Sequence, residues 1–124
     1  MNYTRFFFVS GCILAALAVV AGAFGAHALE GRLTPERMAT FETAARYQMY
    51  HALALLACAA AVNRFAAGTA TAAGWLILGG ILIFSGTLYA LSFGAPRILG
   101  AITPIGGVAL IAGWVLLALA ALRT

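Results

Sequence analysis

Hydrophobic residues fill four long stretches of the chain, and short polar segments separate them. The first stretch, Phe6 to Ala28, is apolar almost throughout and exceeds the about 20 residues that cross a bilayer core of ~30 Å. The pattern therefore predicts membrane-spanning helices at about 6–28, 46–63, 72–91 and 98–122. Because the second and third connections are short, we expect an all-α, integral membrane, antiparallel four-helix bundle (up-down-up-down). Residues 1–124 would form a single transmembrane domain with both termini on the same side.

The polar interfacial segment 29–45 separates the first two spans and carries most of the charge between spans. Thr34-Pro35-Glu36 is typical of a helix start, because threonine caps the first turn, proline suits the first position and an acid favours the positive helix end. A helix from Pro35 to about Asn63 would be ~43 Å long at about 1.5 Å per residue, more than the membrane core requires. We therefore expect a surface extension at the start of the second helix.

The composition agrees with a membrane protein. Hydrophobic residues make up 65% of the chain, charged residues only 8%, and the mean hydropathy is +1.05, whereas soluble domains carry about 25% charged residues. The arginines are scattered singly, so we expect no nucleic-acid partner, which would need a basic stripe. Cys12 and Cys58 lie in apolar stretches, and we expect no disulfide. Arginines are evenly divided between the two sides of the membrane; Arg5, which precedes the first span, favours cytoplasmic termini.

Small residues recur at helical spacing in three of the predicted spans. Such residues let membrane helices approach closely. We therefore expect helix packing at Gly11, Gly22, Gly25, Gly79, Gly86, Gly106 and Gly113. The pair Thr103-Pro104 predicts an irregular start to the last span, with the regular helix beginning at Pro104.

Polar residues concentrate in one leaflet of the predicted bundle, where spans one and three end and spans two and four begin. We expect a polar layer there, formed by His27, Arg46, Gln48, Tyr50, His51, Ser85, Tyr89 and Thr103. A turn of about 100° per residue directs Gln48 and His51 toward the other helices. Arg46 lies on the opposite face, where we expect it to pair with Glu42 and to reach toward the lipid headgroups.

Two interpretations of the polar layer remain open. Ionisable residues inside a membrane are candidates for a binding site, because burying one without partners costs several kcal/mol. Polar side chains can equally hydrogen-bond between helices and hold the bundle together, at about 0.6 kcal/mol per contact. His51 is the residue that we most expect to exceed a structural role, whereas His27 is at a span end and can simply meet water.

The sequence argues against an enzyme. A metal site needs three or four ligands and only two histidines are available, while Cys58 lies about 10 Å further along the helix than His51. A haem held by His27 and His51 is geometrically conceivable, but no attachment motif accompanies them. No carboxylate lies inside a span, so a paired acid and base is absent. We expect no catalytic residues, no metal and no cofactor.

Four motifs in order resemble one known family. They are Gly22-Ala-Phe-Gly-Ala-His27, the Arg-Tyr-Gln-Met-Tyr-His run of residues 46–51, Ser85-Gly-Thr-Leu-Tyr89 and Thr103-Pro-Ile-Gly-Gly107. Together they resemble the YgdD-type family of small four-span membrane proteins, the domain of unknown function 423 family. The resemblance implies a protein of the bacterial inner membrane with a eukaryotic transmembrane relative, and it implies no activity.

Three hypotheses about function follow from these observations. The first is a small non-enzymatic inner-membrane protein whose polar layer binds a lipid headgroup, a small ligand or a partner helix. The second is a small transporter or proton-linked permease in which His51 and His27 titrate along a pathway. The third is an accessory subunit of a larger membrane complex, or a homo-oligomer, because thin helices rich in alanine and glycine leave little room for an internal cavity.

Overall fold

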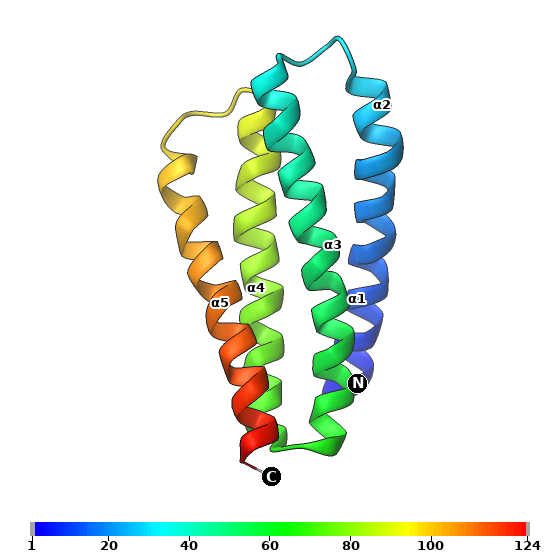
Figure 1. Cartoon of the computed structure of the whole chain (residues 1–124), viewed down its shortest axis with the longest axis vertical. Helices are drawn as coiled ribbons and strands as arrows, with labels where there is room; N and C mark the ends of the chain where they lie inside the picture. The colour runs from blue at the N-terminus through cyan, green and yellow to red at the C-terminus, as the bar shows by residue number, and fades with distance from the viewer. Residues whose placement is uncertain (1, 124) are drawn as a thin grey trace.

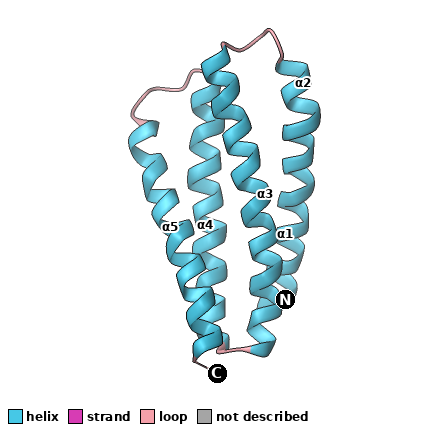
Figure 2. Ribbon diagram, viewed as in Figure 1, coloured by secondary structure: helices cyan, strands magenta, loops and turns pink. Residues whose placement is uncertain are grey.

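The computed structural model describes residues 2–123, and the chain forms a bundle of long antiparallel helices. The elements are α1 (Tyr3–Val19), a π-helical turn η1 (Val20–Gly25), α2 (Ala26–Leu29), α3 (Pro35–Arg64), α4 (Ala67–Ser92) and α5 (Leu99–Leu122). α1, η1 and α2 form one continuous rod, and only short loops join the rods (Figure 2). The rods alternate in direction, and α1 begins at the end of the bundle where α5 finishes (Figure 1). The predicted all-α membrane bundle is confirmed.

The helix starts follow local rules. The Thr34 side chain accepts a hydrogen bond from the Arg37 amide at 3.2 Å, and Pro35 occupies the first turn of α3, as the sequence predicts. Asn2 caps α1 in the same way, accepting from the Arg5 amide at 2.8 Å. α3 ends at Arg64, one residue from the expected end. It is therefore longer than a bilayer core requires.

The prediction that α5 begins at Pro104 is wrong. α5 begins at Leu99, and Pro104 lies inside its second turn. The proline lacks the amide that would bond the carbonyl of Gly100, so only one hydrogen bond is lost, close to an exposed helix end. The Thr103 hydroxyl donates to the Leu99 carbonyl at 3.0 Å, which holds the same turn together.

α3 and α4 form the central pair of the bundle. α1 packs on α3, and α5 packs on α4, so that α1 and α5 occupy the outer positions (Figure 1). The buried core lies between the central pair and includes Leu55 and Cys58 of α3 and Ile77 of α4. Phe7 of α1 and Leu110 of α5 enter this core from the two sides. The bundle is therefore built outward from α3 and α4.

Close contacts between helices test the packing glycines. A Cβ on Gly11 would lie 2.8 Å from the Ala52 carbonyl oxygen, and one on Gly106 would lie 2.5 Å from the Phe84 amide nitrogen. A Cβ on Gly113 would meet the Ile77 side chain at 2.5 Å. These three glycines allow α1 to approach α3 and α5 to approach α4. The packing that we expect at Gly22 and Gly25 is looser, with nearest atoms at 3.9 Å and 3.1 Å.

The packing expectation is wrong for Gly79 and Gly86 of α4. No atom lies within 4 Å of a Cβ built on either, and Gly86 lines an open hollow rather than a close contact. The close approaches of α4 are instead at Gly74, against the Phe7 ring, and at Gly80, against the Leu110 side chain. The spacing of small residues showed where α4 has glycines, but it did not show which of them contact α1 and α5.

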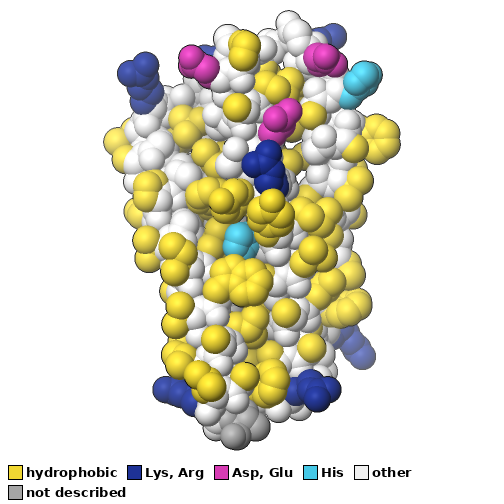
Figure 3. All heavy atoms as spheres, viewed as in Figure 1, with side chains coloured by type: hydrophobic (Ala, Val, Ile, Leu, Met, Phe, Trp, Pro, Cys, Tyr) yellow, Lys and Arg dark blue, Asp and Glu magenta, His cyan; other side chains and the backbone are white. Residues whose placement is uncertain are grey.

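Three helical segments are long and apolar enough to cross a membrane: Tyr3–Leu29, Ala67–Ser92 and Leu99–Leu122. Hydrophobic side chains cover the middle of the molecule, and most of the charged ones gather near its two ends (Figure 3). α3 is not among these three segments, and its middle carries the polar residues Gln48 and His51. The chain is a membrane protein by the composition of its surface.

Candidate functional site

Gln48 joins three helices. Its side chain is 6% exposed, and its amide Nε2 donates to the Leu14 carbonyl of α1 at 2.8 Å. Its Oε1 accepts from the Tyr89 hydroxyl of α4 at 2.7 Å. The prediction that Gln48 faces the bundle is confirmed, and both its amide nitrogen and its amide oxygen have a partner in the protein. We call these contacts the Gln48 junction.

Two further contacts join helices nearby. The Ser85 hydroxyl of α4 donates to the Ala44 carbonyl of α3 at 2.8 Å. Thr103 of α5 and Thr87 of α4 share a hydrogen bond between their hydroxyls at 2.6 Å. Among residues 2–123, no buried side-chain nitrogen or oxygen lacks a partner. This part of the polar layer holds helices together, as the structural interpretation expects.

His51 faces a different neighbour. Its Nδ1 lies 2.7 Å from the Tyr47 carbonyl oxygen, and its Nε2 accepts from the indole Nε1–H of Trp114 at 3.0 Å. Because a carbonyl only accepts and an indole N–H only donates, both bonds require a neutral imidazole with its proton on Nδ1. His51 is 6% exposed, which confirms that it faces the bundle. Its partner Trp114 was missed, because a tryptophan in an apolar span resembles a lipid-facing side chain.

His51 and Trp114 line a hollow of about 590 Å³ between α3, α4 and α5. We call it the aromatic groove, and its lining consists of Tyr47, Tyr50, His51, Phe84, Gly107, Leu110, Ile111 and Trp114. Ring contacts order one wall, since the Tyr47 ring lies 5.0 Å from that of Phe84 and 5.6 Å from that of Tyr50. Tyr50 is 49% exposed, so it forms the rim of the groove.

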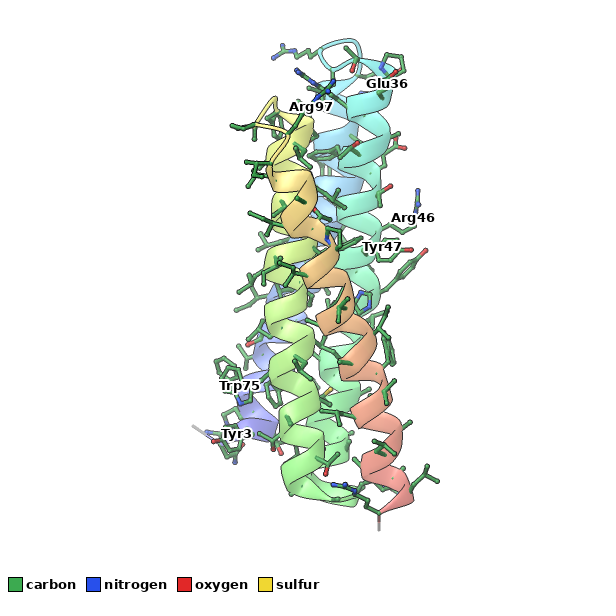
Figure 4. All side chains as sticks on the ribbon, turned by 90° about the vertical axis from the view of Figure 1, so that its left-hand side faces the viewer. Tyr3, Glu36, Arg46, Tyr47, Trp75 and Arg97 are labelled. Carbon is green, nitrogen blue, oxygen red and sulfur yellow. The ribbon has the colours of Figure 1, made fainter. Side chains whose placement is uncertain are left out.

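Arg46 and Glu42 line a second hollow, of about 320 Å³, between α1 and α3. We call it the α1–α3 cleft, and its other lining residues are Ala18, Gly22, Ala45 and Met49. The expected ion pair between Arg46 and Glu42 is not formed. The one charge contact among residues 2–123 joins His27 and Glu30. The Arg46 side chain extends away from the bundle (Figure 4).

His27 lies apart from the rest of the predicted polar layer. Its side chain is 86% exposed at the end of the α1 rod, with Nδ1 3.8 Å from the Glu30 carboxylate. Because His51 is buried against Trp114, the two histidines do not face a common site. Among residues 2–123, no three His, Cys, Asp or Glu side chains lie close enough together to hold a metal ion.

The predicted single layer is therefore divided. Gln48, Ser85 and Tyr89 serve the junctions of α3 with α1 and α4, whereas Thr103 serves that of α5 with α4. His51 and Tyr50 belong to the aromatic groove, and Arg46 belongs to the α1–α3 cleft. The cause is that successive faces of α3 meet different helices.

Comparison with known proteins places this architecture. The family model "Protein of unknown function (DUF423)" matches residues 21–107. The chain is similar to the UPF0382 membrane protein YwdK of Bacillus subtilis, with 46% identity over 120 residues that cover 96% of this chain and 98% of that protein. It is also similar to the UPF0382 membrane protein SERP0230 of Staphylococcus epidermidis, with 48% identity over 123 residues covering 96% and 97%. No solved structure matches the chain. The chain thus belongs to the DUF423 family, as its four motifs suggest.

Proposed function

We propose that this chain is a non-enzymatic, four-span protein of the bacterial inner membrane that holds a membrane lipid in the aromatic groove. The observation that carries this proposal is the groove itself, about 590 Å³ in volume and lined mainly by aromatic and aliphatic side chains. Apolar hollows with few polar groups are typical of sites for apolar ligands. In a membrane, the ligand class at hand for a hollow on the side of a bundle is lipid.

The position of the groove along α3 supports a lipid ligand. Counting back along α3 from Asn63, about 20 residues at ~1.5 Å each cover a ~30 Å bilayer core and end near Thr43. His51 then lies within the hydrocarbon, and Tyr47 lies one turn nearer to the headgroups. Tyrosine suits this position, since its ring is apolar and its hydroxyl is polar.

The same count supports four spans. α3 lies between α1 and α4 and runs antiparallel to both. If these two helices cross the membrane, the apolar half of α3 crosses it with them. Its first turns, from Pro35 to about Glu42, then extend beyond the core as the predicted surface extension. Arg5 before the first span favours cytoplasmic termini.

The contacts of His51 argue against catalysis and proton transport. Both of its ring nitrogens have partners, and no carboxylate lies beside it to orient a base. The Nε2 side meets an indole N–H, which donates but cannot accept a proton. A proton relay would therefore have to break the Trp114 bond at each passage, and apart from His51 and the two tyrosines the groove is lined by groups that cannot ionise.

Filling the groove tests the proposal. In Gly107→Leu the new Cβ lies at an ordinary 3.7 Å from the Phe84 ring, and the rest of the side chain enters the groove. Lipid that stays with the detergent-purified protein is counted by mass spectrometry. We expect Gly107→Leu to retain about tenfold less lipid than the unmodified chain, the effect of ~1.4 kcal/mol.

Gly100→Leu is the matched control. Gly100 lies two turns earlier on α5, does not line the groove, and its nearest neighbour stands at 4.0 Å. It should retain lipid like the unmodified chain. Thermal unfolding checks that Gly107→Leu is still folded. If it is, equal lipid retention by all three proteins would overturn the proposal.

A further inference from the structure

We propose that the α1–α3 cleft binds the headgroup of a zwitterionic aminophospholipid, with the phosphate on Arg46 and the primary ammonium on Glu42. This headgroup site rests on the proposed function, because it names the class of lipid that the protein selects. It uses other residues than the aromatic groove does, since the two linings share no side chain.

The cleft has room for a headgroup because small residues form its floor. Ala18, Gly22 and Ala45 lie beneath the two charged residues, and a Cβ on Gly22 would still stand 3.9 Å from its nearest neighbour. No residue of η1 or α2 is fully buried, so the surface of the cleft on this side is accessible. The π-helical turn η1 contributes Gly22 to the cleft, and such turns often accompany functional sites.

The two charges of the cleft are free to meet a ligand. Glu42 and Arg46 are four residues apart on α3, a spacing that favours an ion pair. Within residues 2–123 neither side chain makes an ion pair or a side-chain hydrogen bond, and both line the same hollow. A guanidinium is well suited to phosphate, since its planar N–H groups can bond two phosphate oxygens at once.

The order of the charges along the membrane normal matches an aminophospholipid. The backbone of Arg46 lies one turn, ~6 Å, deeper than that of Glu42 at about 1.5 Å per residue. In such a lipid the phosphate lies next to the glycerol and the ammonium lies further out. A neighbouring hollow of about 430 Å³ shares Glu42 and adds Glu30 and His27, so two carboxylates lie on the outer side of the cleft. A phospholipid headgroup without a cation could still bind Arg46 through its phosphate. It would have no positive charge to place beside these carboxylates.

The depth of the cleft is also that of headgroups. The count along α3 ends the bilayer core near Thr43, which puts Glu42 at its boundary and Arg46 about 4–5 Å inside. An arginine at that depth extends its side chain toward the surface, and Figure 4 shows Arg46 directed away from the helices. The Arg46 guanidinium can therefore reach a phosphate group at the boundary of the core.

Lipid competition tests the headgroup site. The full chain is equilibrated in detergent with equal amounts of ethanolamine and glycerol phospholipids that carry identical acyl chains, and retained lipids are quantified by mass spectrometry. We expect about fivefold enrichment of the ethanolamine lipid, the size of a partly exposed charge contact. Glu42→Gln should abolish the enrichment and leave the total retained lipid unchanged. Glu36→Gln, an exposed change on the same helix outside the cleft, should preserve it.

Two outcomes would overturn the headgroup site: an unmodified chain that retains both lipids equally, or enrichment that survives Glu42→Gln. Soluble phosphoethanolamine supplies the same charges without acyl chains, and displacement of the lipid by it at micromolar concentration would overturn a lipid as the source. The lipid ratio tests the cleft, whereas the total in Gly107→Leu tests the groove. The two proposals can therefore fail separately.

Discussion

Gln48 and His51 lie about one turn apart on α3, and both are almost completely buried, yet their surroundings differ. Gln48 joins α1 and α4 through bonds to a backbone carbonyl and a tyrosine hydroxyl, and these bonds hold three helices together beside a smaller hollow of about 300 Å³. His51 bonds an indole that is itself a wall of the aromatic groove, and the helices remain apart there. One helix thus supplies a structural junction on one side and a candidate binding site on the other.

The difference follows from what each side chain bonds. A residue bonded to the backbone of another helix fixes the distance between the two helix axes. A residue such as His51, whose only bond to another helix is to the end of a large side chain, allows a wide separation because that side chain bridges it. The Gln48 junction should therefore matter for stability and the His51–Trp114 bond for the shape of the groove.

The largest effect on stability should come from Gly106, where α5 approaches the backbone of α4 most closely behind the groove. In Gly106→Ala the new methyl would lie 2.5 Å from the Phe84 backbone nitrogen, which cannot rotate away. We expect a loss of about 3 kcal/mol in the free energy of unfolding in detergent, the upper range for overpacking.

Gly86→Ala is the matched control for this glycine. No atom lies within 4 Å of its new methyl, and alanine favours a helix over glycine by about 1 kcal/mol. It should be neutral or stabilising. Equal losses in the two variants would show that α5 does not approach α4 as described.

A smaller loss should follow from Gln48→Ala. The change removes two hydrogen bonds between helices and leaves the Tyr89 hydroxyl without its partner, so we expect destabilisation by about 2 kcal/mol. Thermal unfolding of the purified protein measures it. Lipid retention in the aromatic groove should persist in the folded fraction, since Gln48 does not line it. A variant as stable as the unmodified chain would contradict the structural role of the junction.

The smallest effect should come from the bond between His51 and Trp114. Trp114→Phe keeps an aromatic wall and removes one hydrogen bond, which costs about 0.6 kcal/mol inside a membrane. A double-mutant cycle with His51→Phe isolates this coupling energy from the packing changes. A coupling as large as the loss in Gln48→Ala would erase the distinction between the two sides of α3.

Several parts of the site follow from local pattern. The Thr34 cap, the length of α3 and the inward direction of Gln48 and His51 depend on neighbours within a few residues, so periodicity and capping rules predict them. The partners do not follow. Trp114 lies 63 positions from His51, and Thr87 is one of several similar hydroxyl residues, so only packing identifies them.

By itself the amino-acid sequence determined a membrane-embedded, antiparallel helical bundle with polar residues toward one end, because hydropathy and helical period act along the chain. Tertiary structure alone decided which face of α4 packs, since Gly74 and Gly80 rather than Gly79 and Gly86 meet side chains of α1 and α5. It also divided the polar residues among a junction, a groove and a cleft. The physical reason is that close packing depends on the rotation of each helix about its own axis, which side chains from distant parts of the chain determine together.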